Sequence, residues 1–473
     1  MQEPLIFHEK EEAAKFISEK GIKILNLCHI PEDGRLKTLS FSAENEKRVK
    51  EILEVGERVD GSNLFSFIEP DKSDIYIKPR LDKAFPNPFA TVPTLNILCD
   101  YLDEDGKPLD IAPKNVLKRA EEKLRSSRGI VLKALAELEF YIISKLEAEM
   151  LFSGFPDKNY HESAPFTKFE DIRNEILATL AAVGVATKYA HSEVGRIFTK
   201  DGLFMEQHEV EFALQNLSEM AETIAITKWI IRNICQKHGV SASFSPKIAL
   251  EHAGNGMHIH ICALNNGENI IANPNGTLSQ EALKIIGGIL KFAPSLAAFG
   301  NPTPASYLRF TARKESPMHI CWSARNRLAL IRIPLWWNFV KKDESQNNPR
   351  ETFEYRGPDP LANAYLLFAG IALAANYGLE NPEETLKIAE KLKVEKTNGK
   401  GKRFKLLPRS CHEAAKNLRK DRRFYEANGI FPKAVIDKTI QKLKDYRDKD
   451  LWKTLTENPQ KAEKLLRQYT HYG

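Results

Sequence analysis

A short segment with two glycines and two histidines is the first stretch of the sequence that could do chemistry. Residues 253–260 read Ala-Gly-Asn-Gly-Met-His-Ile-His, and the glycines allow a tight turn or a close approach to a ligand. His258 and His260 alternate with apolar residues at the period of a β-strand, so both imidazoles are expected on one face. The pattern predicts a metal or polyphosphate site, although an ordinary strand with hydrogen-bonded histidines would show the same pattern.

Two further strand-like segments carry pairs of carboxylates. Glu137 and Glu139 alternate with apolar residues, and Glu209 and Glu211 repeat the pattern. On an exposed edge these carboxylates would simply face solvent, whereas in a buried strand the repulsion between like charges requires a cation. Carboxylates together with one or two imidazoles suit hard divalent ions such as Mg²⁺ and Mn²⁺.

Arginines in the C-terminal half extend this charged set. The pair Arg325 and Arg327, then Arg332, then the pair Glu354 and Arg356 are all predicted on strand faces. Because an unpaired buried charge is costly, these strands predict a funnel filled by water and ligand. Acids that hold metals beside arginines that hold phosphates are the components of phosphoryl transfer. The sequence has no Walker A motif, kinase His-Arg-Asp loop or Rossmann glycine fingerprint, so a nucleotide site would be of another kind.

These charged strands fall in the larger of two predicted domains. Residues 1–108 are predicted as a small α+β unit that ends in a polar turn at 103–108, which is typical of a linker. Ser42 is the predicted cap of the second helix of this unit. Residues 109–473 form the second predicted domain. Within it, helices are expected at 113–128, 217–239 and 281–298, a strand at 130–143 and a loop at 301–309.

Composition is typical of a soluble enzyme. The 473 residues are 42% hydrophobic and 28% charged with a net charge of +6, so neither a nucleic acid nor a membrane partner is expected. Scattered cysteines and the lack of a secretory signal together predict a cytoplasmic protein. The most apolar run, 361–379, is broken by polar residues and is predicted as a buried helix. The basic stretch 391–405 is predicted as a solvated loop.

The order and spacing of short motifs along almost the whole chain resemble the glutamine synthetase family. Each motif is weak alone, but together they are highly specific. In chain order they are Asp60-Gly61-Ser62, Glu137-Leu138-Glu139-Phe140, Glu193-Val194-Gly195, Gln207-His208-Glu209, Pro246-Lys247, Gly254 to His260, Asn301-Pro302-Thr303, Ser306-Tyr307-Leu308-Arg309, Arg325-Asn326-Arg327, and Glu354-Tyr355-Arg356-Gly357-Pro358-Asp359-Pro360.

The resemblance implies an α+β fold with an N-terminal β-grasp-like domain and a catalytic domain in which a funnel of antiparallel strands is flanked by helices. It implies the ATP-dependent ligation of ammonia to the γ-carboxylate of L-glutamate through γ-glutamyl phosphate, giving L-glutamine, ADP and phosphate. ATP and two or three Mg²⁺ or Mn²⁺ ions per active site are then expected. A homo-oligomer, a dodecamer in the bacterial type, is also expected, with each active site completed by the N-terminal domain of a neighbouring subunit.

Family roles carry over to matching positions of this sequence. The ligands of two metal sites would be Glu139, Glu193 and Glu209 for the first, and Glu137, His258 and Glu354 for the second. The groups that hold glutamate would be Gly254, Arg309, Arg327 and Arg356. The groups near ATP and its phosphates would be His260, Arg327 and Arg332. The catalytic groups beside ammonium and the acyl phosphate would be Asp60, Arg327 and, on a mobile loop, Glu315.

Departures from the family pattern leave two alternatives open. An insertion lies between Glu193 and Glu209, Ala253 stands where the family often has an asparagine, Asn63 replaces a serine and Ser192 replaces a histidine. These changes touch the substrate and ammonium pockets, so one alternative is a γ-glutamyl ligase for a larger amine or polyamine. The other is a catalytically silent relative, against which the filled metal positions argue.

Overall fold

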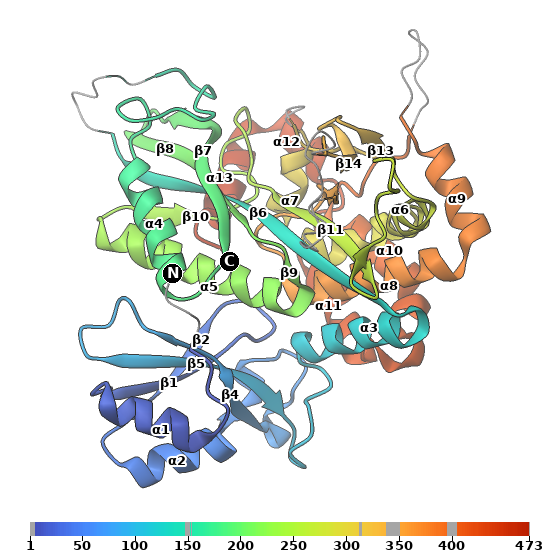
Figure 1. The fold of residues 1–473 in the computed structure, drawn as a ribbon. Coiled ribbons are helices and arrows are strands. Elements are labelled where there is room, and N and C mark those ends of the chain that lie inside the picture. Colours follow the sequence, from blue (N-terminus) through green and yellow to red (C-terminus); the bar gives the residue numbers. More distant parts are fainter. Residues whose placement is uncertain are drawn as a thin grey trace.

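The N-terminal part of the chain is built on a mixed sheet. The computed structural model describes residues 5–146, 152, 154–311, 315–336, 351–394 and 404–472. Parallel strands β1 and β5 lie at the centre of the sheet between antiparallel neighbours, and helices α1 and α2 cover its outer side (Figure 1). The order is β2-β1-β5-β4-β3, and the bounds are α1 Lys10–Glu19, β1 Ile24–His29, β2 Lys37–Ser42, α2 Glu46–Val55, β3 Glu57–Asp60, β4 Asp74–Pro86 and β5 Thr94–Leu102.

The two ends of α2 follow from local chemistry. Asn45, and not the predicted Ser42, caps the helix, because the Asn45 side-chain oxygen accepts a hydrogen bond from the backbone N–H of Arg48 at 3.0 Å. Ser42 is instead the last residue of β2. Gly56 follows the helix with φ of 79°, and a Cβ there would lie 2.0 Å from the carbonyl oxygen of Ile77, so only glycine fits.

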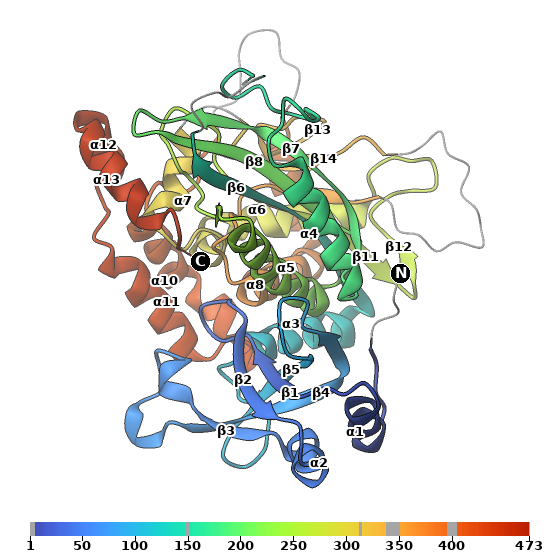
Figure 2. The ribbon, with the colours of Figure 1, turned by 90° about the vertical axis from the view of Figure 1, so that its left-hand side faces the viewer.

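The larger part of the chain is organised around a long sheet whose strands come from distant parts of the sequence. Neighbouring strands are antiparallel apart from β13 and β14. Figure 2 shows β7, β8 and β14 at the end of the molecule opposite β3. The order is β13-β14-β15-β11-β6-β8-β7, and the bounds are β6 Ile130–Lys145, β7 Thr187–Phe198, β8 Leu203–Phe212, β11 Met257–Asn265, β13 His319–Ala324, β14 Ala329–Ile333 and β15 Phe353–Tyr355. Short strands β9 (Gln215–Asn216), β10 (Ser241–Ser243) and β12 (Glu268–Asn269) pair with β6 or β11.

Long helices pack against this sheet or against one another and confirm the predicted helical segments. They are α3 Pro113–Arg128, α5 Leu217–Lys237, α6 Gln280–Gly300 and α8 Ala364–Glu380. The predicted loop 301–309 was wrong in part, because Thr303 and Ser306 form a capping box that starts α7 (Pro304–Leu308). The remaining helices are α4 Glu170–Ala182, α9 Pro382–Lys391, α10 Cys411–Glu426, α11 Lys433–Asp445, α12 Leu451–Glu457 and α13 Pro459–Tyr469. Most of the basic stretch 391–405, predicted as a solvated loop, lies outside the described residues.

One helix of the described part, α6, is long and apolar enough to cross a membrane by length and composition alone. However, 78% of its most apolar window is buried inside the protein, as in the core helix of a soluble protein. The predicted buried run 361–379 is confirmed as α8, which contacts α6. All six cysteines are free and buried.

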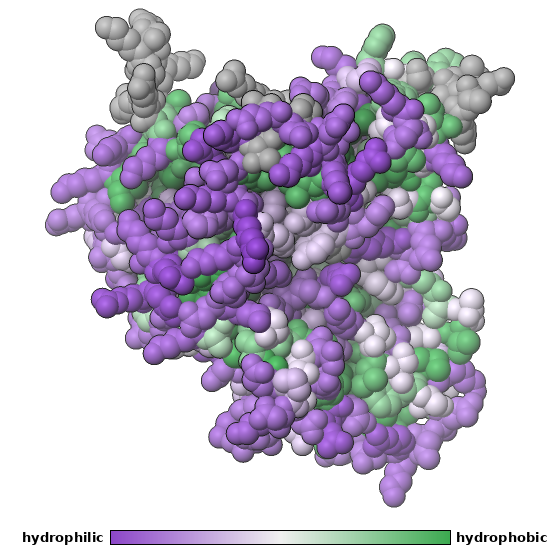
Figure 3. Space-filling model, turned by 180° about the vertical axis from the view of Figure 1, so that it is seen from behind, coloured by the Kyte–Doolittle hydropathy of each residue, from purple (hydrophilic) through white to green (hydrophobic). Residues whose placement is uncertain are grey.

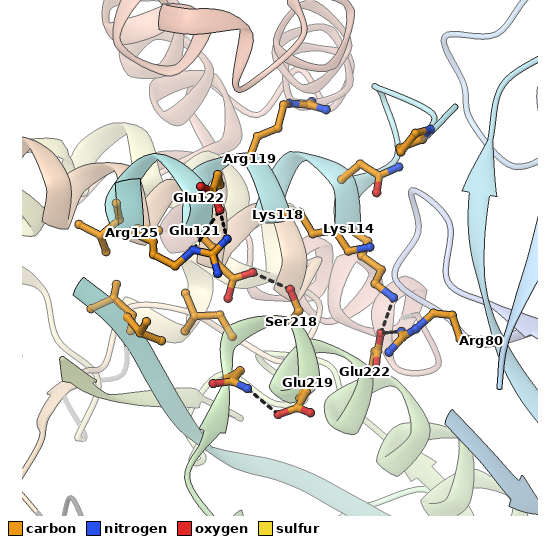
Figure 4. A pocket seen from close by; sticks show the side chains of 18 of the residues that line it. Arg80, Lys114, Lys118, Arg119, Glu121, Glu122, Arg125, Ser218, Glu219 and Glu222 are labelled. Atoms are coloured by element: carbon orange, nitrogen blue, oxygen red, sulfur yellow. Dashed lines mark hydrogen bonds and ion pairs between the residues drawn. The ribbon is translucent and has the colours of Figure 1, made fainter. Parts of the chain in front are cut away.

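Ion pairs join the two parts of the chain beside a cavity of about 770 Å³ (Figure 4). Glu222 of α5 accepts a hydrogen bond from Arg80 of β4 and lies 2.9 Å from the ammonium of Lys114 in α3. Lys83 of β4 donates to Glu219 at 3.0 Å. Because each of these charges has a partner, the ion pairs hold β4 against α3 and α5 without leaving a buried charge unpaired.

Candidate active site

A smaller cavity of about 300 Å³ opens between β6, β7, β8 and the loop that precedes β11. Its lining brings carboxylates and imidazoles together, whereas the lining of the cavity between the two parts of the chain holds no histidine among the described residues. Most of the predicted site residues line it, namely Glu137, Glu139, Glu193, Glu209, Gly254, His258, Arg309, Glu315, Arg327 and Arg356.

Strand register brings these side chains to one face. His258 of β11 lies opposite Glu137 of β6, and Glu139 lies opposite Glu209 of β8. Because side chains alternate along a strand, His260 shares the face of His258. Glu137 contacts both imidazoles, with its Oε2 2.8 Å from Nδ1 of His258 and its Oε1 2.9 Å from Nε2 of His260. The predicted strand through the two histidines is confirmed from Met257 onward.

The Gly-Asn-Gly loop holds one carboxylate in place. The backbone N–H of Gly256 donates to Oε2 of Glu139 at 2.7 Å, and Nε2 of Gln207 donates to the same oxygen at 3.1 Å. A Cβ at Gly256 would lie 2.6 Å from both Nη2 of Arg309 and Nε2 of His258, so the close approach requires glycine. Gly256, one of the two glycines predicted to approach a ligand, therefore also allows side chains of the cavity wall to pack closely against this loop.

Burial makes the carboxylate cluster unfavourable without a cation. Burial and the nearby charge of Glu193 raise the pKa of Glu139 to about 8, and burial raises the pKa of Glu193 itself to about 7. Burial and the charges of Glu137, Glu139 and Glu193 raise the pKa of Glu209 as well. Burial lowers the pKa of His258 to about 4, so its imidazole is neutral, which is the form that binds metals. This donor set fits a divalent cation.

The described residues contain three groups whose ligand atoms lie within 4.8 Å of one another. They are Glu137, His260 and Glu354; Glu137, Glu209 and His258; and His191, Glu193 and Glu209. Five of the six predicted metal ligands recur here, in combinations that differ from the two predicted sets and that add His191 and His260. Glu139 lies outside these groups, and its Oε2 is held by Gly256 and Gln207.

We expect Mg²⁺ to raise the melting temperature more at about pH 8.5 than at about pH 6. A carboxyl whose pKa is raised by folding binds more protons in the folded state than in the unfolded state. Its contribution to the free energy of unfolding therefore falls as the pH rises from 4.5, the ordinary pKa, to about 7 for Glu193 and about 8 for Glu139. Mg²⁺ replaces those protons and relieves the repulsion. Thermal denaturation with and without Mg²⁺ at both pH values measures this, and an equal or larger shift at the lower pH would contradict it.

Two buried arginines complete the cavity wall. Arg309 donates to the carbonyl oxygen of Gly357 at 3.0 Å, and its Nη2 lies 3.3 Å from Nε2 of His258. Arg356 donates to Glu354 and, at 3.2 Å, to the carbonyl oxygen of Glu315. Guanidinium groups fixed in this way can bind a carboxylate or a phosphate in a bidentate manner.

Of the arginines predicted to bind phosphate, Arg327 lines the cavity and Arg332 does not. Arg325 and Arg327 were wrongly predicted on a strand face, because they lie in the turn between β13 and β14, where Arg325 has φ of 61°. Arg327 still reaches the cavity, where its Nη1 lies 3.4 Å from Oε2 of Glu315. Arg332 lies outside the cavity lining and pairs with Glu354 at 2.8 Å.

Asp60 is not brought to this cavity within one chain. It ends β3 on the N-terminal sheet, where it is exposed and accepts hydrogen bonds from the hydroxyl of Ser62 at 2.7 Å and from the amide of Asn63 at 2.5 Å. Ser62 lowers the pKa of Asp60 through these bonds, so its carboxylate is ionised. β3 lies at the opposite end of the molecule from β7 and β8 (Figure 2).

Several groups in the cavity wall had no predicted role. Gln207 and His191 lie two residues before Glu209 and Glu193, so the period of the strand could have found them. His191 lies 3.3 Å from Glu209, and its ring contacts that of Tyr160. Tyr160 lies in an irregular segment between β6 and α4, where no periodic signal marks it.

Comparison with known proteins agrees with this architecture. Residues 21–104 match the model of the glutamine synthetase beta-Grasp domain, and residues 110–462 match that of the glutamine synthetase catalytic domain. The chain is 35% identical over 420 residues to a glutamine synthetase of Pyrococcus abyssi, covering 88% of this chain and 89% of the relative. A solved Plasmodium falciparum glutamine synthetase superposes with a TM-score of 0.79 at 22% identity and covers 94% of this chain and 97% of its own. A structure named GmaS, without ligand, superposes with a TM-score of 0.73 at 22% identity over 92% of this chain and 96% of its own. The predicted fold is confirmed, and the chain belongs to the glutamine synthetase family.

Proposed function

We propose that this protein ligates ammonia to the γ-carboxylate of L-glutamate through γ-glutamyl phosphate, consuming ATP and releasing L-glutamine, ADP and phosphate. The observation that carries this proposal is the 300 Å³ cavity, in which carboxylates suited to divalent metals face arginines suited to carboxylate and phosphate. The family uses ATP and a divalent metal, and the chain covers most of the length of its relatives.

Glutamate activation can be assigned to groups that line this cavity, together with Arg332 and His260, which lie outside its lining. Arg309, Arg356 and the loop at Gly254 would hold glutamate, with Arg327 beside its γ-carboxylate. Arg327 and Arg332, with His260 nearby, would hold the phosphates of ATP and stabilise negative charge on the transferring phosphoryl group. The γ-carboxylate oxygen then attacks the γ-phosphorus, and ADP leaves.

Metal binding can be assigned to carboxylates and imidazoles in the lining of the same cavity or grouped with its residues. Two or three Mg²⁺ or Mn²⁺ ions per site would neutralise the phosphates and orient them when bound. The proposed ligands are Glu137, Glu139, Glu193, Glu209, His258 and Glu354. The contacts of His191 with Glu209 and of His260 with Glu137 place these imidazoles close enough to contribute.

The second step requires a neutral amine. Glu315, and Asp60 from a neighbouring subunit, would take a proton from ammonium, because only the unprotonated nitrogen is a nucleophile. Ammonia then attacks the acyl carbon, and phosphate departs carrying an oxygen of the original carboxylate. Arg327, which already contacts Glu315, would stabilise the charge on the departing phosphate.

This step requires a homo-oligomer, which we take to be a dodecamer, because Asp60 would come from a neighbouring subunit. Asp60 ends β3, which lies at the opposite end of the molecule from the cavity strands β7 and β8 (Figure 2). This distance is explained if Asp60 serves the cavity of a neighbouring subunit. We divide the chain into an N-terminal domain, residues 1–108, and a catalytic domain, residues 109–473, and place the protein in the cytoplasm, where its free cysteines stay reduced.

A larger amine is the second candidate acceptor. Ala253, which has a smaller side chain than the asparagine common in the family, lines the cavity, and the space that it leaves could admit an alkyl substituent. The aromatic wall formed by Tyr160 and Tyr189 would suit such a group.

An amine panel separates the two candidates. Phosphate release from ATP is measured with Mg²⁺, glutamate and either ammonium, methylamine, ethylamine or a polyamine, and the product is identified by mass. We expect the highest kcat/KM with ammonium and glutamine as the product. Turnover with larger amines alone would assign the protein to the second candidate, and no turnover with any amine would contradict both.

A further inference from the structure

The insertion between Glu193 and Glu209 forms an extension of the hairpin β7–β8. In this extension, which we call the arm (residues 196–206), Arg196 lies opposite Glu206 and Phe198 lies opposite Phe204. The proposed reaction assigns the arm no role. Its contacts nevertheless lead back to the cavity.

A neighbouring segment runs along β7 beside the arm. This flanking segment (residues 157–168) connects to β7 through backbone hydrogen bonds from the N–H of Asp157 to Arg196 at 3.3 Å, of Asn159 to Val194 at 3.3 Å and of His161 to Ser192 at 3.0 Å. The hydroxyl of Ser192 donates to the carbonyl oxygen of Glu162 at 2.9 Å. Ser192 is thus part of the attachment.

A buried ion pair in the arm anchors the other end of the flanking segment. Arg196 and Glu206 have side-chain exposures of 1% and 0% and lie 3.3 Å apart. Nη2 of Arg196 also donates to the side chain of Asn159 and to the carbonyl oxygen of Phe166 at 2.7 Å. Glu206 accepts a hydrogen bond from the hydroxyl of Thr167 at 2.6 Å. Arg196 and Glu206 would still pair with each other, and His208 lies 3.2 Å from Glu206, if the flanking segment were released. The buried charges would nevertheless lose the hydrogen bonds that Asn159, Phe166 and Thr167 supply, which opposes release.

The flanking segment delivers side chains to the cavity. Asp157 and Tyr160 line it, and Tyr160 stacks on His161 with 4.1 Å between ring centroids. His161 in turn lies 4.4 Å from His191, which contacts Glu209. Aromatic faces beside carboxylates attract cations. Asp157 and His161 also have φ of 50° and 58°, a costly conformation for residues other than glycine, so outside contacts must hold them.

We propose that Arg196 and Glu206 are positioning residues that hold the flanking segment against β7, so that the ring of Tyr160 on that segment sets the affinity for the cationic acceptor. This inference rests on the proposed ligase function. It assigns the insertion a role in recognising the acceptor amine, separate from the binding of ATP at Arg332 and His260.

Glu206→Gln tests the role of the ion pair. The variant keeps the shape of the side chain but removes its charge, so we expect the KM for ammonium to rise about tenfold while the KM for ATP stays unchanged. Thr167→Val, which removes one donor to Glu206 and keeps the side-chain shape, should give a smaller rise in the same direction. It also keeps the test available if Glu206→Gln fails to fold.

Tryptic cleavage reports on the segment without using the ligase reaction. Lys158 is exposed in the flanking segment, and cleavage after it should be faster in both variants at temperatures well below melting. If both variants are cleaved faster but the wild type shows no ligase activity, the ion pair does anchor the segment and the proposed function is contradicted. Unchanged cleavage together with an unchanged KM for ammonium would overturn the inference.

Two control variants separate positioning from general stability. Asp201→Asn breaks the exposed pair between the tip of the arm and Arg467, which are 3.4 Å apart, and should change neither KM. Gly378→Ala forces a Cβ to 2.2 Å from the carbonyl oxygen of Lys284 between α8 and α6, so it should lower the melting temperature without raising the KM for ammonium. An equal rise in KM for ammonium in Gly378→Ala would mean that loss of stability alone explains the effect.

Discussion

Replacing Glu209 by glutamine is expected to lower kcat about a thousandfold or more while leaving the fold at least as stable as in the wild type. The carboxylate of Glu209 belongs to two of the three groups of potential metal ligands in the described residues. Burial and the charges of Glu137, Glu139 and Glu193 already oppose its ionisation, so a neutral amide of the same shape relieves repulsion. Activity and stability should therefore change in opposite directions, which loss of folding could not produce.

The measurements are the Mg²⁺ dependence of phosphate release and the melting temperature. Glu211→Gln is the matched control, because Glu211 lies on the same strand face but pairs with Lys188 at 2.6 Å and belongs to none of the ligand groups of the described residues. It should retain most of the activity. Wild-type turnover in Glu209→Gln, with unchanged Mg²⁺ dependence, would contradict the metal assignment.

Glu354 is less suited to the same experiment. Its carboxylate, which is fully buried, pairs with Arg356 and, at 2.8 Å, with Arg332. Removing it would take from both arginines the acidic partner that they have among the described residues, at a cost of about 3–5 kcal/mol. Loss of activity in Glu354→Ala would then report on folding as well as on metal binding.

Asp60→Asn is expected to lower glutamine formation about a hundredfold or more, because an amide cannot take a proton from ammonium. Asp60 is exposed and bonded to its neighbours Ser62 and Asn63, so the substitution should not disturb the fold. The cavity of such a variant keeps every other proposed group. The defect should therefore lie in the use of ammonium, with the KM for ATP unchanged.

Mixing subunits tests whether Asp60 acts across an interface. Asp60→Asn subunits carry an intact cavity and Glu209→Gln subunits carry an intact Asp60, so mixed oligomers contain some complete sites. Random equal mixing should restore about a quarter of wild-type activity, since both halves of a site are intact with a probability of one half each. No recovery after confirmed subunit exchange would mean that Asp60 does not serve a neighbour.

Much of the site could be predicted because its side chains follow simple periods. Glu137, Glu139, His258 and His260 lie on strands where every second residue faces the cavity, and the structure confirms that they meet. The ends of α3 were also predictable, because Pro113 and Gly129 favour a helix start and a helix end.

Other features depend on contacts between residues far apart in the sequence. Nothing local to Arg196 shows that it will be buried beside Asn159 and Phe166, 37 and 30 residues away. Likewise, the regular pattern around Arg327 resembled a strand, but the turn between β13 and β14 positions it near Glu315. Strand register and loop packing decide these contacts, and neither is encoded in a local pattern.

The fate of one oxygen atom tests the central claim most directly. Glutamate labelled with ¹⁸O in both γ-carboxylate oxygens is incubated with ATP, Mg²⁺, ammonium and the enzyme, and the released phosphate is analysed by mass spectrometry. If the γ-carboxylate is activated as an acyl phosphate, each phosphate carries one ¹⁸O and the glutamine amide keeps the other. Unlabelled phosphate accompanied by glutamine, or phosphate released without any glutamine, would contradict the account.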